Sequence, residues 1–220
     1  MQEWVLDERK FLTDEEIEHL KRNCRTAKEK LIINLGLLAG LRVKEVADLK
    51  CGDISLLAVN PSGCYSQLSR RMSGFTSGIT TSSLTVRNGK GGKPRLVRFN
   101  GELKESIMEY LNNPLTSPLP LGERERVRGE NEPLLKSGNN GHISRRTIQR
   151  VFERVAGRAG ISGHSFHHLR HTYASYLYRA SNYNLRLVQK QLGHSSIKTT
   201  QVYADVFDED LNQAVEKLYK

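Results

Sequence analysis

The sequence HHLRHTYASYL occupies residues 167–177, and LGHSSIKTTQVY follows at residues 192–203. Together they place histidines, an arginine and a tyrosine close together in the chain. A tyrosine hydroxyl is a poor nucleophile at neutral pH, because its pKa near 10 leaves only about one group in a thousand ionised. Arginine and histidine beside it are what attack on a phosphodiester requires, since they supply hydrogen-bond donors and a base. The simpler alternative is a core tyrosine near surface histidines.

A helix that begins at His167 brings three polar residues onto one face. His167, Arg170 and His171 are three and four residues apart, so their side chains are neighbours on the helix surface. A different face carries the packing residues, which are Leu169, Tyr173, Tyr176 and Leu177. His167 and His171 also have the spacing of zinc ligands, but no third ligand is near and Arg170 would repel a cation. We therefore expect no metal here.

The composition indicates a basic protein of moderate size. A chain of 220 residues is long enough for one domain with a sizeable core. Its net charge of +10 and isoelectric point near 9.6 favour a polyanionic partner, most simply nucleic acid. A merely soluble basic protein has the same charge, so this observation does not decide between the two.

Cysteine usage and the ends of the chain predict the compartment. Cys24, Cys51 and Cys64 form no metal-ligand pattern and cannot all pair, which is typical of reduced cysteines in an intracellular protein. The first ten residues, MQEWVLDERK, contain no apolar core of a signal peptide. No apolar run approaches membrane-spanning length. The sequence therefore predicts a soluble, cytoplasmic protein without a membrane partner.

The periodicity of apolar residues predicts a mainly α fold with a small antiparallel β-sheet. Thr13 begins a capping box ahead of a first helix. Further helices are predicted at residues 27–39, 102–112, 144–159, 167–180, 185–192, 197–207 and 210–218. Residues 84–87 and 95–99 alternate like half-buried strands, and the glycine-rich stretch NGKGGKP (residues 88–94) between them is typical of a hairpin turn.

Two segments depart from this pattern. Residues 55–83 are rich in Ser, Gly and Thr, and residues 112–132 are rich in proline and end in a charged run. Both are predicted to be surface insertions or mobile loops without a chemical role. The first could displace the predicted hairpin or simply loop out of the fold.

The predicted helix at residues 144–159 carries a basic face. Arg146, Arg150 and Arg154 recur at every fourth residue, so the face drifts slowly around the helix. Such a face is often only solvated. In a nucleic-acid-binding protein it would follow the phosphate backbone, and these three residues are our candidates for that contact.

Four stretches resemble the signature blocks of the tyrosine recombinase, or phage integrase, family. They are GLRVKEVADLKCGDI (residues 40–54), VRNGKGGKPRLV (86–97), HHLRHTYASYL (167–177) and LGHSSIKTTQVY (192–203). They occur in the family's order, with similar local spacing, over roughly residues 12–203. The resemblance implies the fold of the family's catalytic domain, and the activity of a site-specific DNA recombinase or integrase.

The resemblance also implies six catalytic residues, which are Arg42, Lys90, His167, Arg170, His194 and the nucleophile Tyr203. Attack of the tyrosine on a DNA phosphate would pass through a five-coordinate state, whose extra negative charge Arg42 and Arg170 could bind. His167 would accept the tyrosine proton, and Lys90 would protonate the leaving 5′ oxygen. His194 would donate a hydrogen bond to the phosphate.

Two further residues are expected to support this site. Glu45 stands where the family usually has an acidic residue, and His171 is expected to be structural or to lie behind the phosphate contacts. Taken singly, several candidates have simpler explanations. Arg42 could cap the preceding helix, Lys90 could be an ordinary hairpin lysine, and His194 could satisfy backbone groups after the helix-ending Gly193. Their joint occurrence in the family's order favours the catalytic interpretation.

The resemblance implies an organisation as well as a chemistry. Residues 1–220 are expected to form a single catalytic domain that lacks the family's N-terminal core-binding domain. The implied partners are double-stranded DNA, three further copies of the chain on paired DNA sites, and accessory directionality proteins. The implied reaction, through a 3′-phosphotyrosyl intermediate, needs neither a metal ion nor ATP. The protein is expected in the cytoplasm, associated with the nucleoid.

Two alternatives to this function stay open at the level of sequence. A type IB topoisomerase shares this kind of site but relaxes supercoiled DNA without a defined partner site. An integrase remnant would bind DNA without cutting it, and the two insertions motivate this possibility. The short chain and the LGH of the last block favour a recombinase over a topoisomerase.

Overall fold

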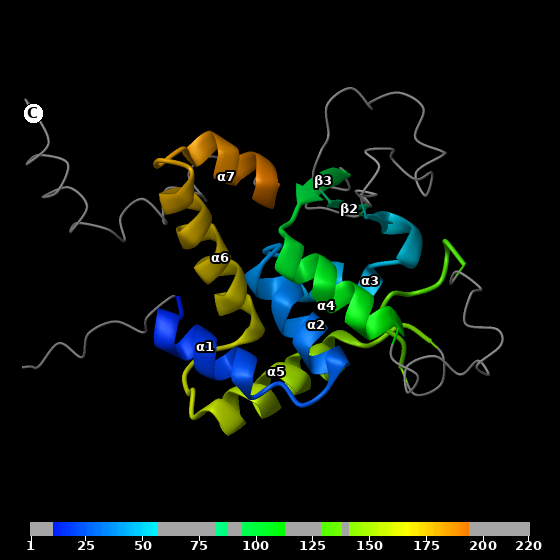
Figure 1. The fold of residues 1–220 in the computed structure, drawn as a ribbon, viewed down its shortest axis with the longest axis horizontal. Helices are drawn as coiled ribbons and strands as arrows, with labels where there is room; N and C mark the ends of the chain where they lie inside the picture. Colours follow the sequence, from blue (N-terminus) through cyan, green and yellow to red (C-terminus); the bar gives the residue numbers. More distant parts are fainter. Residues whose placement is uncertain (1–10, 57–81, 88–93, 113–128, 138–140, 194–220) are drawn as a thin grey trace, which may run out of the picture.

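The computed structural model describes residues 11–56, 82–87, 94–112, 129–137 and 141–193 (Figure 1). The prediction of a mainly α fold with a small antiparallel sheet is confirmed in these residues. The helices are α1 (Asp14–Arg22), α2 (Ala27–Leu37), α3 (Val43–Asp48), α4 (Gly101–Asn112), α5 (Arg145–Ala159), α6 (Phe166–Ala180) and α7 (Leu185–Leu192), with a 3₁₀ turn, η1 (Cys51–Asp53). The strands are β1 (Ile54–Ser55), β2 (Ser83–Val86) and β3 (Arg95–Arg98).

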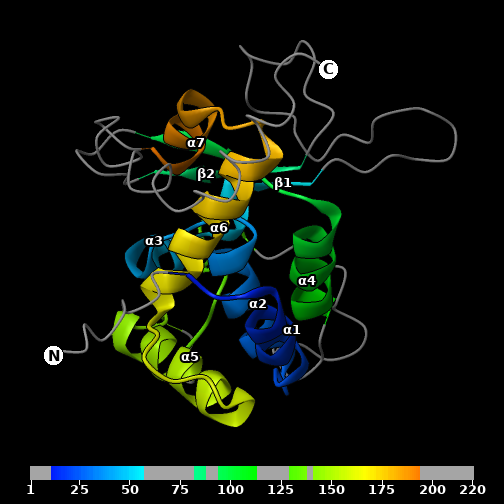
Figure 2. The same ribbon diagram turned by 90° about the vertical axis from the view of Figure 1, so that its left-hand side faces the viewer.

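Helix α2 is the centre of the fold. Apolar residues lie all round it, and a helix of this kind is stable only when other elements cover every side. Helices α4, α5 and α6 pack against it, as Figures 1 and 2 show from two directions. Gly36 permits the close approach of α6, because a Cβ atom there would lie 2.8 Å from Leu169 Cδ1.

The sheet joins the two ends of the first predicted insertion. Its order is β1-β2-β3, and all neighbours are antiparallel. Ser55 pairs with Ser83, so the two outermost residues of the predicted insertion belong to strands. That boundary was therefore wrong by one residue at each end. Strand β2 pairs on its other side with β3, with Val86 opposite Arg95.

The boundaries of the second predicted insertion were also too wide. Asn112 is the last residue of α4, and residues 129–132 pack on η1. The Gly52 and Cys51 backbone amides donate hydrogen bonds of 2.9 Å to the Glu130 and Glu132 carbonyls. The low-complexity composition of this segment gave no sign of these hydrogen bonds.

Local capping signals place the helix ends. The predicted capping box at Thr13 is present, and Gly160 and Gly193 end α5 and α7 in the left-handed conformation. Helix α3 and strand β1 were not predicted, and at six and two residues they are too short for periodicity to reveal them. The helices predicted at residues 197–207 and 210–218 lie outside the described residues. Within the described residues, no helix is long and apolar enough to span a membrane.

Candidate active site

The turn between α2 and α3 places the first predicted catalytic arginine. Gly40 adopts φ +61°, and a Cβ atom there would lie 2.4 Å from the Tyr173 ring, so only glycine fits. Two residues later Arg42 is the N-cap of α3, with its side chain 29% exposed. Its guanidinium Nη1 donates to Glu45 Oε1 at 3.0 Å, so this bond points to α3 and not to the end of α2.

Glu45 lies within ion-pair distance of three arginines, which belong to three different elements. Its carboxylate is almost fully buried. It accepts hydrogen bonds from both terminal nitrogens of Arg95, a residue of β3, at 2.7 and 2.8 Å. It also accepts the Arg42 backbone amide at 2.9 Å, and Arg170 Nη1 of α6 lies 3.8 Å away. We call these four residues the Glu45 cluster. Burial raises the pKa of Glu45, but the Arg95 hydrogen bonds and the surrounding charges outweigh it and hold the pKa below its usual value.

Arg170 is the most deeply buried of the three predicted catalytic residues that the structure describes. Its side chain is 1% exposed, and it donates to the Gly40 carbonyl and, at 2.8 Å, to the Leu192 carbonyl. It therefore fastens the ends of α2 and α7 together. Arg170 is thus buried although His167, predicted on the same face of the helix, is exposed. The assignment of Tyr176 to the packing face was wrong, because this residue is 38% exposed. Spacing on one helix cannot show which neighbouring elements cover it.

His167 lies at the open edge of the cluster. It is exposed, and burial of part of its ring together with the charges of Arg170, His168 and Arg42 lowers its pKa below 6.5. The imidazole is therefore neutral at pH 7 and able to accept a proton. The half-buried His171 ring packs edge-on against it, with the ring centres 4.5 Å apart, which limits how His167 can turn.

Three of the predicted catalytic residues, Lys90, His194 and Tyr203, lie outside the described residues. The described neighbours of two of them are part of the site. Residues 88–93 connect β2 to β3, and Arg95 follows them on β3. Gly193, which precedes His194, adopts φ +67°, and a Cβ atom there would lie 2.5 Å from Arg95 Cδ.

Sequence reasoning missed two residues of this region, Arg95 and Gln191. Gln191 of α7 donates to the Arg98 carbonyl at 2.6 Å and to the Tyr173 hydroxyl at 3.0 Å, so it joins α7 to β3 and α6. A signal for Arg95 was present. It alternates with Val97 and Phe99, both buried, which places a charged residue on the inward face of the strand.

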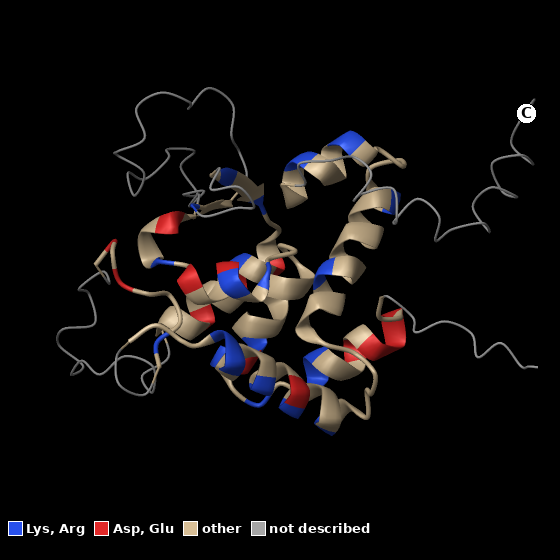
Figure 3. Ribbon diagram, turned by 180° about the vertical axis from the view of Figure 1, so that it is seen from behind, with Lys and Arg blue, Asp and Glu red and all other residues tan. Residues whose placement is uncertain are grey.

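The predicted basic face of α5 divides into two parts. Arg146, Arg150 and Arg154 are all exposed, and Figure 3 shows basic positions recurring along this helix. Arg154, however, lies 3.9 Å from Glu29 of α2, and Arg158, one turn later, binds the same carboxylate at 2.6 Å. The C-terminal half of this face is therefore partly used inside the fold, whereas Arg146 and Arg150 point to solvent.

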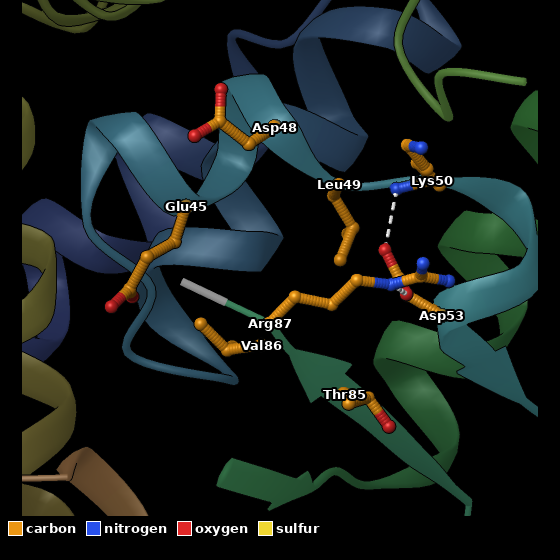
Figure 4. A pocket seen from close by; sticks show the side chains of 8 residues that line it. All are labelled: Glu45, Asp48, Leu49, Lys50, Asp53, Thr85, Val86 and Arg87. Atoms are coloured by element: carbon orange, nitrogen blue, oxygen red, sulfur yellow. Dashed lines mark hydrogen bonds and ion pairs between the residues drawn. The ribbon is translucent and has the colours of Figure 1, made fainter. Parts of the chain in front are cut away.

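A small pocket lies between α3, η1 and β2. Its volume is about 170 Å³, and it is lined by Glu45, Asp48, Leu49, Lys50, Asp53, Thr85, Val86 and Arg87. In Figure 4 the Arg87 side chain reaches the Asp53 carboxylate, and the Glu45 carboxylate points away from that pair. Asp53 also accepts the Lys50 backbone amide at 2.9 Å. The Asp53 carboxylate thus ties Arg87, next to the end of β2, to the start of η1.

The chain is similar to proteins of a known family. A sequence model of the phage integrase family matches residues 72–210. Among curated proteins, the chain is 31% identical over 214 residues to tyrosine recombinase XerA of Pyrococcus furiosus, covering 94% of this chain and 61% of that protein. It is 32% identical over 188 residues to tyrosine recombinase XerC of Caldanaerobacter subterraneus, covering 84% and 43%. The chain thus spans 61% of the length of the XerA relative and 43% of the length of the XerC relative.

Comparison with solved structures agrees on the fold. The crystal structure of a XerA recombinase superimposes with a TM-score of 0.69 at 24% identity, covering 96% of this chain and 65% of that one. A XerH site-specific recombinase, in a pre-cleavage complex with its difH substrate, gives a TM-score of 0.67 at 22% identity, covering 100% and 57%. At these identities the likeness establishes the fold.

Proposed function

Since the chain belongs to the phage integrase family, we propose that it cuts and rejoins duplex DNA at specific sites, with Tyr203 as the nucleophile. The relatives named as tyrosine recombinases support this activity, although the chain spans only part of their length. The proposal treats the described domain as the catalytic part of such an enzyme.

The observation that carries the proposal is the excess of positive charge in the Glu45 cluster. Three guanidiniums surround one carboxylate there, so about two positive charges remain to bind a phosphate. A phosphodiester under attack gains negative charge on its non-bridging oxygens, and fixed arginine donors stabilise it without reorganising. Arg42 is the more accessible donor, because its side chain is 29% exposed, whereas that of Arg170 is 1% exposed.

The proposed reaction exchanges one phosphoester for another. The Tyr203 oxygen bonds to phosphorus while the bond from phosphorus to the 5′ oxygen breaks, and the 3′ end stays on the enzyme. The phenol proton passes to His167, whose lowered pKa keeps it neutral, and Lys90 gives a proton to the 5′ oxygen. His194 donates to the phosphate. Because the bond energy is retained, a second 5′ hydroxyl can reverse the step on another strand without ATP or a metal ion.

The charge distribution suggests how DNA would lie on the domain. Arg146 and Arg150 at the N-terminal half of α5 are exposed and suited to phosphate contacts, with Arg154 a weaker candidate because Glu29 attracts it. Paired strand exchange would need four copies of the chain on two DNA sites, together with directionality proteins. Such an enzyme would work at the nucleoid.

A trapping experiment tests the proposal. The protein is incubated with nicked duplexes made from the DNA that flanks its own coding sequence, and covalent adducts are resolved on a denaturing gel. We expect an adduct with the wild type and none with Tyr203→Phe. Tyr176→Phe is the matched control, because this exposed tyrosine of α6 lies outside the Glu45 cluster and should leave the adduct intact.

The same assay separates the alternatives. Clear DNA binding without an adduct on any flanking duplex would contradict the proposal and favour a non-catalytic remnant. An adduct accompanied by relaxation of an unrelated supercoiled plasmid, with no recombinant product between flanking sites, would favour a topoisomerase. Native mass measurement of the trapped complex tests the assembly, for which we expect four protein chains on two duplexes.

A further inference from the structure

We propose that Arg95 is a positioning residue that couples two described segments of the candidate active site. These segments are the start of α3, which carries Arg42, and the end of α7. The inference rests on the proposed function, since the two segments matter together only if they act on one phosphate. Arg95 itself would touch neither the phosphate nor the tyrosine.

The first link runs from Arg95 to Arg42 through Glu45. Both terminal nitrogens of Arg95 bind the two carboxylate oxygens of Glu45 in a fork, at 2.7 and 2.8 Å. Glu45 in turn holds Arg42 twice, by its backbone amide and by its guanidinium. The Arg95 side chain is 9% exposed, so it holds the carboxylate and is not presented to DNA.

Arg95 also fills part of the hydrogen-bonding capacity of the Glu45 carboxylate. A carboxylate offers about four lone-pair sites, and the fork from Arg95 occupies two of them. Arg170 Nη1 accordingly stays 3.8 Å from the carboxylate, beyond hydrogen-bond distance, and turns to backbone carbonyls. Arg42 occupies the other two lone-pair sites, through its backbone amide and its guanidinium. With Arg95 in place, the acceptor sites of Glu45 are therefore filled without a hydrogen bond from Arg170.

The second link runs from Arg95 to the end of α7. The Gly193 backbone passes so close to the Arg95 side chain that a Cβ atom would lie 2.5 Å from Cδ and 3.1 Å from Nε. Gln191 fixes the same helix end to the next part of β3, through the Arg98 carbonyl at 2.6 Å. These two contacts fix the end of α7 to β3.

The strand holds Arg95 itself in place. Arg95 is the first residue of β3 and pairs with Val86, the last residue of β2. A lysine at position 95 would keep the charge but not the fork, because an ammonium group binds as a point charge.

The first test needs no DNA. Amide hydrogen exchange is compared for wild type, Arg95→Lys, Arg95→Gln and the matched control Arg98→Gln, whose arginine is on the same strand but exposed. We expect exchange at the Arg42 amide and at the end of α7 to accelerate about tenfold in both Arg95 variants, because local opening there becomes easier. The control should exchange like wild type. Unchanged exchange in the Arg95 variants would overturn the inference.

The second test separates positioning from folding. In single-turnover cleavage of the nicked duplex at saturating protein, a variant that merely folds less well loses burst amplitude at an unchanged rate constant. We expect Arg95→Gln to keep its amplitude while the rate constant falls about a hundredfold, which is the effect of misplacing catalytic groups by about 1 Å. Loss of amplitude alone would overturn the inference.

The third test asks whether Arg95 acts through Glu45. If it does, the rate constant of Arg95→Gln combined with Glu45→Gln should be no lower than that of the worse single variant, because the two residues form one unit. Multiplying effects would contradict the link. If wild type forms no adduct, the proposed function fails, and the hydrogen-exchange arm still decides whether Arg95 couples these segments.

Discussion

Two buried glutamates, each facing arginines, lie in different parts of the molecule. Glu45 of α3 is the centre of the Glu45 cluster. Glu29 of α2 accepts hydrogen bonds from Arg158 Nη2 of α5 at 2.6 Å and from the Arg25 backbone amide at 2.9 Å. Arg154 lies 3.9 Å away, and we call these four residues the Glu29 cluster. Both glutamates are 6% exposed, and in both the arginine contacts outweigh burial and hold the pKa below its usual value.

The two clusters differ in their surroundings. Beside Glu29 lies the Cys24 thiol, whose pKa burial raises to about 11, so it stays protonated and unreactive at neutral pH. Beside the Glu45 cluster lies the exposed, neutral His167. Glu29 joins two helices, whereas the Glu45 cluster draws from α3, β3 and α6. A buried ion cluster alone therefore does not identify an active site, and the base at its edge is the better sign.

The largest difference between the clusters should be seen by removing each carboxylate. For Glu45→Ala we expect the single-turnover cleavage rate constant to fall about 10²- to 10³-fold, as when a fixed transition-state donor is lost. The physical reason is that Arg42, Arg95 and Arg170 would repel one another and leave their positions. A rate equal to wild type would show that the cluster is structural only.

The corresponding change in the Glu29 cluster should act on stability. For Glu29→Ala we expect the free energy of unfolding to drop by about 3 kcal/mol, because Arg158 would be left as a half-buried charge without its partner. Urea unfolding measures this, with the exposed Glu18→Ala as control. The cleavage rate constant per folded molecule should stay at the wild-type value, and a large fall in it would erase the distinction between the clusters.

The pH dependence of cleavage sharpens the comparison further. The pKa of His167 is below 6.5, so its imidazole is neutral and able to act as a base at pH 6.5 and above. It gains a proton only when the pH falls to its lowered pKa. We expect the rate to be flat from about pH 8 to 6.5 and to fall at most about tenfold per unit below the folded pKa. His167→Gln should remove this acid limb. A fall that begins above pH 7 would contradict the lowered pKa.

The folded pKa values also predict how stability changes in acid. A lowered pKa at His167 means that the unfolded chain takes up its proton first, so this group lowers stability as the pH falls from 6.5 towards the folded value. The lowered pKa values of Glu29 and Glu45 act in the same direction at lower pH, below about 4.5. Denaturation at stepwise pH values should show both losses, and Glu29→Gln should remove part of the second.

The smallest expected effect compares two arginines of α5. Arg146→Gln should reduce the salt slope of DNA binding by about one unit, as expected for one lost phosphate contact. Arg154→Gln should change that slope less and lower stability by no more than about 0.5 kcal/mol, since its side chain is 63% exposed and 3.9 Å from Glu29. Equal salt slopes would mean that Glu29 does not compete with DNA for Arg154.

Most of the fold was predictable because its signals are local. The capping box at Thr13, the left-handed glycines at 160 and 193, and the apolar spacing of α7 place those helices within a residue. The candidate site was predictable only as a set of motifs. That Arg170 is buried, and that Arg95 completes the cluster, depends on contacts between α6, α3 and β3, which no single segment encodes. The catalytic roles of all six candidates remain predictions, and Lys90, His194 and Tyr203 also lie outside the described residues.

The pairing of Ser55 with Ser83 has a consequence for how such a chain can change over generations. Because the two positions are adjacent across the sheet, the cost of joining them grows only with the logarithm of the intervening length. Duplication, repeat expansion or insertion of foreign sequence between them would leave the register of β2 and β3 untouched. This point of the fold therefore tolerates growth, and selection can act on the catalytic blocks on either side without constraining the sequence between them.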